Sequence, residues 1–139
     1  SGGLEFEGNA KLTHKIPAGP EITAPADGDV VPHDAPLLVK WKKVTGPIIS
    51  GLGPVEIVGY HVVVVDVTVS VLPPGKLKTA LDADLSKNET TFLVPKQYLE
   101  PDRIYEFEVL ATEKGGNQTI TEGGVFCTPP ITAANCELP

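Results

Sequence analysis

The chain has 139 residues, which suits one domain with short extensions and is too short for two full β-sandwiches. Its fourteen glycines, fourteen prolines and few aromatic residues favour short strands joined by turns, so an all-β fold is expected. The formal net charge of -7 and scattered basic residues argue against nucleic acid or an anionic membrane as a partner. No apolar run reaches the roughly 18 residues that span a bilayer, so membrane insertion is not expected.

The N-terminal half begins with loosely alternating residues, and we assign residues 1–17 to an extension or to the end of a preceding module. A short extended segment between two prolines, closed by an Asp-Gly turn, predicts an edge strand within residues 20–29. Alternation over residues 36–43 predicts a strand that buries Trp41. The Gly- and Pro-rich loop of residues 45–54 is unusually apolar.

The longest β-prone run covers Ile57–Leu72 and is apolar on both faces over several residues. One face holds Tyr60, Val62 and Val64, which we expect in the core. The opposite face should then lie on the outside of the sheet, where a patch of this size indicates a contact surface. The candidate interaction face consists of His61, Val63, Val65 and Val67, beside Leu110 of the neighbouring strand. It could be covered by the chain itself, through residues 4–16 or the loop of residues 48–52, or by a partner chain, including a second copy.

The C-terminal half starts with residues 76–89, which show no strong period and are interpreted as a polar crossing. Residues 90–94 predict a short strand, and the stretch Leu99–Thr112 predicts a corner followed by a strand of clean period two. Residues 113–119 predict a hairpin loop, and residues 124–128 predict the last strand. About seven strands result.

The corner places Pro101 and Asp102 shortly before Tyr105, whose ring we expect to be buried with its hydroxyl bonded to backbone near Leu99. This is the tyrosine corner of Greek-key sandwiches. Leu99, Pro101 and Tyr105 match the L-x-P-x-x-x-Y pattern, and Trp41 and Tyr60 match core aromatics of a fibronectin type III domain. The other matching elements, in order, are Pro20-Glu21-Ile22, Asp27-Gly28, Gly59-Tyr60-His61-Val62, Tyr105 to Val109, Ala111, Gly116 and Thr128.

The chain thus resembles a fibronectin type III domain over residues 18–129, with residues 130–139 as a C-terminal tail. The resemblance implies an all-β, two-sheet Greek-key sandwich of the immunoglobulin-like kind. The chain departs from the family pattern in the long Gly- and Pro-rich loop and in both terminal segments. The last hairpin loop contains K-G-G-N and lacks the integrin-binding R-G-D of some members.

The two cysteines, Cys127 and Cys136, flank Pro129-Pro130, which favour a turn that could bring the thiols within bridging distance. We expect a disulfide, which is typical of exported proteins. The alternative is two free thiols in a cytosolic protein. Two cysteines without a nearby histidine make no zinc site.

No cluster of residues predicts catalysis, a cofactor or a metal. The three histidines, at positions 14, 33 and 61, are isolated from any nucleophile motif. Residues 82–89 begin like a calcium loop, but Lys87 replaces the required glycine and Leu93 stands where the bidentate glutamate belongs. The aspartates at 27, 29 and 34 are interpreted as solvated turn residues. Glycosylation sequons begin at residues 88 and 117, and such triplets are frequent by chance.

The sequence therefore favours a non-catalytic extracellular, cell-surface or periplasmic module that binds or spaces other proteins. Its partner would be another protein, a neighbouring domain of the parent chain, or a second copy in a homodimer. The alternative is an accessory domain of a secreted carbohydrate-active enzyme, which would need exposed aromatic side chains.

Overall fold

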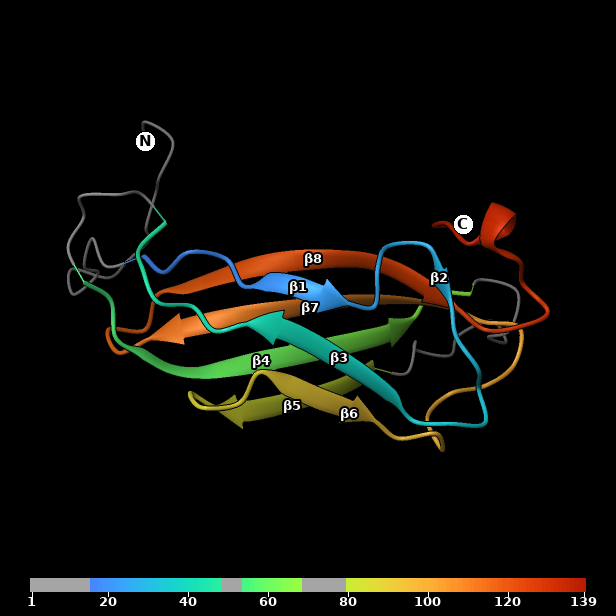
Figure 1. Ribbon diagram of the computed structural model, residues 1–139, viewed down its shortest axis with the longest axis horizontal. Coiled ribbons are helices and arrows are strands. Elements are labelled where there is room, and N and C mark those ends of the chain that lie inside the picture. Colours follow the sequence, from blue (N-terminus) through green and yellow to red (C-terminus); the bar gives the residue numbers. More distant parts are fainter. Residues whose placement is uncertain (1–15, 49–53, 69–79) are drawn as a thin grey trace, which may run out of the picture.

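In the computed structural model, which describes residues 16–48, 54–68 and 80–139, two β-sheets pack face to face (Figure 1). The elements are β1 (Glu21–Ala24), β2 (Asp29–Val30), β3 (Leu37–Lys42), β4 (Ile57–Asp66), β5 (Ala80–Ser86), β6 (Thr91–Val94), β7 (Ile104–Glu113), β8 (Gln118–Cys127) and the 3-10 turn η1 (Ala133–Asn135). The smaller sheet has the order β1-β3-β6, and the larger has the order β2-β8-β7-β4-β5. The predicted all-β, two-sheet sandwich is confirmed.

The core lies between the sheets and is built from the inward positions of their strands. Its most buried members are each at most 3% exposed: Val39, Trp41, Tyr60, Val62, Val64, Val94, Tyr105, Phe107, Val109 and Phe126. The rings of Trp41 and Tyr60 lie 5.5 Å apart. The predicted inward faces of the tryptophan strand and of the valine run are therefore confirmed. No helix among the described residues is long and apolar enough to cross a membrane.

Two predictions on the strands are wrong. The supposed polar crossing contains β5, whose side chains alternate between half-buried Leu81, Ala83 and Leu85 and exposed carboxylates. Strand β8 begins at Gln118, six residues before the predicted start of the last strand at residue 124. The two-residue strand β2, which runs parallel to β8, also went unpredicted, so the described residues form eight strands where about seven were expected.

Two adjacent glycines of β8 form a β-bulge that interrupts the alternation of the strand. Gly123 is the extra residue of a β-bulge, because Phe107 pairs with Gly124 while Glu108 pairs with Glu122. A Cβ on Gly123 would overlap the ring of Phe107, so only glycine lets this ring pack beneath the strand. Gly124 has a φ of +87°, which favours glycine. The bulge shifts the alternation of β8 by one residue.

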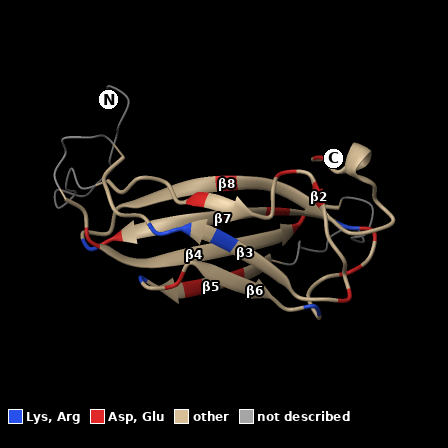
Figure 2. Ribbon diagram, in the orientation of Figure 1, with Lys and Arg blue, Asp and Glu red and all other residues tan. Residues whose placement is uncertain are grey.

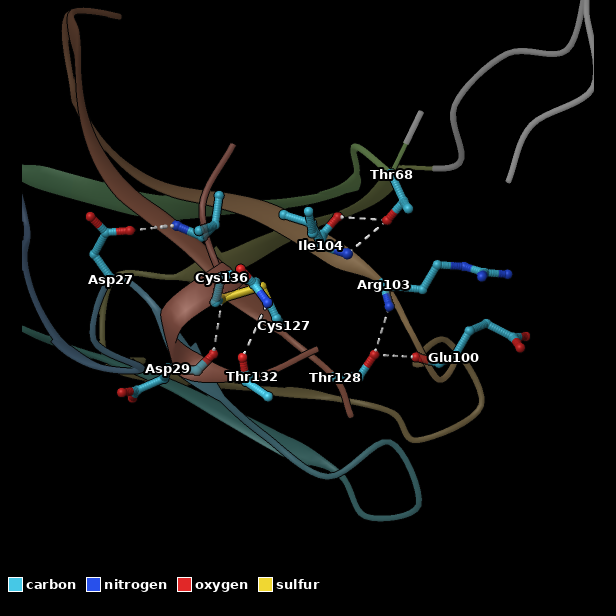
Figure 3. The surroundings of a disulfide bond; sticks show 12 residues. Asp27, Asp29, Thr68, Glu100, Arg103, Ile104, Cys127, Thr128, Thr132 and Cys136 are labelled. Carbon is cyan, nitrogen blue, oxygen red and sulfur yellow. Dashed lines mark hydrogen bonds between the residues drawn. A yellow bond between two sulfur atoms is a disulfide. The ribbon is translucent and has the colours of Figure 1, made fainter. Parts of the chain in front are cut away.

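The tyrosine corner joins the core to the loop before β7. Tyr105 is 1% exposed, and its hydroxyl accepts the backbone N–H of Glu100 at 2.7 Å and donates weakly to the carbonyl of Tyr98 at 3.5 Å. Burial raises the pKa of Tyr105, and it raises the pKa of Tyr98 to about 12. The Thr128 hydroxyl donates to the Glu100 carbonyl at 2.6 Å and accepts the N–H of Arg103 at 3.0 Å (Figure 3). The predicted hydrogen bond between the Tyr105 hydroxyl and the backbone is confirmed. The closer of its two backbone partners is the N–H of Glu100.

A disulfide ties the C-terminal tail back to the larger sheet (Figure 3). Cys127 and Cys136 are joined as predicted, with Cα atoms 5.8 Å apart. Cys127 pairs with Ile104 across β7 and β8, on the side of the sheet away from the main core. The bridge packs there in a second apolar cluster with Val30, Ile104, Val125 and Ile131. The tail thus covers one end of the outside of this sheet.

Candidate interaction surface

The outward side chains of four neighbouring strands form one surface, which we call the outer face. They alternate with core residues along each strand, so they point away from the smaller sheet. The outer face consists of His61, Val63 and Val65 of β4, Asp82 and Asp84 of β5, Glu106, Glu108 and Leu110 of β7, and Ile120 and Glu122 of β8.

The predicted interaction face lies on this surface, but its exposure is smaller than expected. His61, Val63 and Val65 are half-buried. Val67 and Leu110 are only 6% and 8% exposed, so the expectation that these two side chains are exposed is wrong. Ile120, which the sequence did not single out, is 53% exposed beside Leu110. The segments predicted to cover the face, residues 4–16 and 48–52, lie almost entirely outside the described residues.

His61 is not isolated, because β5 brings two carboxylates to it. Its Nε2 contacts Asp82, and its Nδ1 contacts Asp84, which is its direct cross-strand partner. A neutral imidazole has one N–H and can donate to only one of them, so both contacts are hydrogen bonds only in the imidazolium form. The sequence does not reveal this arrangement, because the small or charged residues at most positions of β5 are not typical of a strand.

A second acidic group lies across β7 and β8. Glu108 and Glu122 are direct cross-strand partners, and Glu106 follows two residues before Glu108 on the same face. Burial raises the pKa of Glu108, and the charges of Glu122 and Glu106 raise it further, while His61 opposes the shift. Like charges directly opposite each other destabilise a strand pair.

Between these glutamates lies a shallow cavity of about 110 Å³. Its lining combines the valines of β4 with Phe107 and with the three glutamates. The lining residues are Val63, Val65, Glu106, Phe107, Glu108 and Glu122. The cavity therefore has an apolar wall and an anionic wall.

No lysine or arginine lies on the described strands of the larger sheet, where His61 is the one basic side chain. Every described lysine and arginine lies either in a loop or on β3 of the smaller sheet: Lys40, Lys42, Lys43, Lys87, Lys96, Arg103 and Lys114. Figure 2 shows acidic segments along β5, β7 and β8 and the basic segments of β3 on the other sheet. The outer face is therefore acidic and apolar together.

Other residues considered as sites have structural roles. Asp27 accepts the N–H of Val125 at 3.0 Å, and Asp29 accepts the N–H of Ala26 at 2.8 Å, as expected for turn residues. The segment compared with a calcium loop is mostly the regular strand β5. Of the two sequons, Asn88 is exposed, whereas Asn117 is 6% exposed. Among the described residues, no group of three His, Cys, Asp or Glu side chains could hold a metal ion. His14 lies outside them.

Comparison of the structure with solved structures gives the fold. The third fibronectin III domain of the human KIAA0343 protein superposes with a TM-score of 0.57 and 20% identity, covering 95% of each chain. This is the fibronectin type III fold. The fourth fibronectin III domain of a human protein is 16% identical, and the match covers 95% of this chain and 94% of that domain. A myokine structure is 14% identical, and the match covers 84% of this chain and 99% of the myokine chain. Both have TM-scores of 0.48. No protein-family model and no curated protein matches the sequence.

Proposed function

We propose that this fibronectin type III-like domain is a non-catalytic module that binds another protein through its outer face. Domains of this fold generally mediate protein interactions or act as spacers. The observation that carries the proposal is the mixed surface around Val63, Val65 and Ile120, where apolar side chains stay partly exposed on the outer face. The described part of the chain leaves these positions less buried than the core valines.

Export fits this proposal. Fibronectin type III domains are often extracellular, and the Cys127–Cys136 bridge is of a kind that persists in oxidising compartments. We therefore propose an extracellular, cell-surface or periplasmic location. The domain proper would cover residues 18–129, with the disulfide-linked tail of residues 130–139 completing the outer side of the sheet.

The alternative, a carbohydrate-binding accessory domain, has less support. Sugar binding on a sheet face relies on exposed aromatic rings. Among the described residues, the exposed large apolar side chains are all aliphatic: Leu38, Ile48, Val58, Leu93, Ile120 and Leu138. The aromatic rings of the described strands lie mostly in the core.

The test is a Val65→Lys variant, with Leu93→Lys as its matched control. Leu93 is 55% exposed on the smaller sheet, so its substitution introduces the same charge away from the outer face. We expect Val65→Lys to keep the unfolding midpoint of the monomer and to lose association, measured by pull-down from the native extracellular fraction and by light scattering. Leu93→Lys should keep both.

Two results would contradict the proposal. A loss of folding stability in Val65→Lys would show that the face is covered by the chain itself. A variant with unchanged stability and unchanged association would show a face that is simply exposed to solvent.

A further inference from the structure

We propose that the partner bound at the outer face presents a lysine or arginine side chain, which enters the cavity between β4, β7 and β8. This inference rests on the proposed function and specifies the chemistry of the partner. The methylene stem of the side chain would lie on Val63 and Val65, and its cationic end would lie among Glu106, Glu108 and Glu122. The partner is therefore a basic protein surface.

The shape and lining of the cavity match such a side chain. A volume of about 110 Å³ accommodates one extended side chain and not a folded element. Lysine and arginine both combine an apolar stem with a charged end, and the cavity has valines beside glutamates, because Val63 pairs with Glu108 and Val65 with Glu106. Neither a wholly apolar side chain nor an acidic one would satisfy both walls.

The electrostatics of the face point to the same partner. Glu108 and Glu122 repel each other from directly opposed positions, and no lysine or arginine of the described strands of this sheet offsets them. Burial and these neighbours raise the pKa of Glu108, so the isolated domain holds this charge at a cost. A cation from outside would relieve that repulsion.

The same charges argue against other occupants. A second copy pairing through this face would bring one acidic face, with Asp82, Asp84 and the glutamates, against another, and like charges brought together cost affinity. Nucleic acid would be repelled for the same reason. A single metal ion does not fit, because the described residues hold no group of three acidic or histidine side chains close enough to bind one.

The experiment uses NMR titration of the full 139-residue protein with a blocked seven-residue peptide of alternating lysine and valine. An identical peptide with glutamate in place of lysine serves as the charge-reversed probe. We expect the lysine peptide to shift amide resonances of β4, β7 and β8, to bind more weakly as salt is raised, and to bind more tightly than the glutamate peptide.

Two double variants separate the cavity from the general acidity of the chain. E108Q/E122Q removes two carboxylates from the cavity, and E56Q/E89Q removes two exposed carboxylates elsewhere, so both have the same net charge. We expect E108Q/E122Q to weaken binding of the lysine peptide about tenfold and E56Q/E89Q to leave it within about twofold of the wild type.

Several outcomes would overturn the inference. One is that both double variants weaken binding of the lysine peptide equally, and another is that the two peptides bind the wild type equally well. A third is that the lysine peptide does not bind the wild type at all. The last is that amide resonances of the outer face shift with protein concentration, which would show a second copy bound there. Failure of the proposed function is recognised separately. If Val65→Lys abolishes partner capture while E108Q/E122Q does not, the interaction face stands and its basic partner is wrong. If Val65→Lys leaves capture intact, the proposed function itself fails.

Discussion

Tyr105→Phe is expected to destabilise the domain, because the tyrosine hydroxyl is the partner of a backbone N–H at the corner before β7. The N–H of Glu100 donates to it at 2.7 Å, and the tyrosine is 1% exposed. Phenylalanine keeps the ring, which stacks 5.1 Å from that of Phe126, so packing is retained and only the hydrogen bonds of the hydroxyl are lost. Leaving such a donor unpaired costs about 1 to 3 kcal/mol.

The assay is thermal and urea denaturation, followed by the fluorescence of the single tryptophan, Trp41, which is buried. For a domain of this size, about 4 °C of midpoint corresponds to 1 kcal/mol, so the midpoint should fall by about 4 to 12 °C. Tyr98→Phe is the comparison, because its half-buried hydroxyl donates to the Val64 carbonyl at 3.1 Å and its loss should cost less. An unchanged midpoint for Tyr105→Phe would refute the assignment of the corner.

Three further predictions concern the sheet and the tail. Glu108→Gln should stabilise the domain by about 0.2 to 1 kcal/mol at pH 7. The pKa of Glu108 is higher in the folded state than its unfolded value of about 4.5, so the charged carboxylate opposes folding above that pH. The stability gained by Glu108→Gln should therefore vanish in unfolding curves recorded below that pH. Gly123→Ala should cost about 1 to 3 kcal/mol in urea unfolding because of overlap with a core ring, whereas Gly46→Ala, with nothing within 4 Å, should be nearly neutral. Reducing the bridge between Cys127 and Cys136, which are nine residues apart, should cost about 2.5 kcal/mol. Two free thiols found by mass spectrometry after aerobic purification would contradict the disulfide.

The parts of the fold that the sequence predicted correctly are those set by local pattern. The inward set Tyr60, Val62 and Val64 follows from strict alternation in a long β-prone run, and its burial to 2% or less confirms the pattern. The corner is a short motif with a fixed spacing, so Tyr105 could be placed before its partners were known. The bridge between Cys127 and Cys136 was likewise suggested by a turn between neighbouring residues.

The parts that were missed depend on pairing between distant segments. Strand β5 has small or charged residues at most positions. It is a strand because β4 pairs with it along its whole length, from Gly59 opposite Ser86 to Val65 opposite Ala80. Glu108 and Glu122 face each other only because the bulge at Gly123 sets the register of β8. No local sequence pattern indicates this register, so the acidic side of the cavity could not be predicted. The valines on its other side were predicted from the alternation of β4.

One cross-strand pair on the larger sheet contrasts in charge with a pair on the smaller sheet, and this contrast bears on function. On the smaller sheet, Glu21 lies directly across from Lys42, and their side chains form an ion pair at 3.2 Å. On the larger sheet, the equivalent direct pair is Glu108 with Glu122, two carboxylates. A charge pattern chosen for stability alone would place opposite charges at both positions. The larger sheet instead leaves its anionic side chains beside a partly exposed apolar strip, where the proposed basic partner would supply the missing charge. Glu108→Gln tests the stability of the free domain, and E108Q/E122Q tests binding of the lysine peptide. If the first variant is more stable and the second binds more weakly, carboxylates of this group cost folding energy and contribute binding energy.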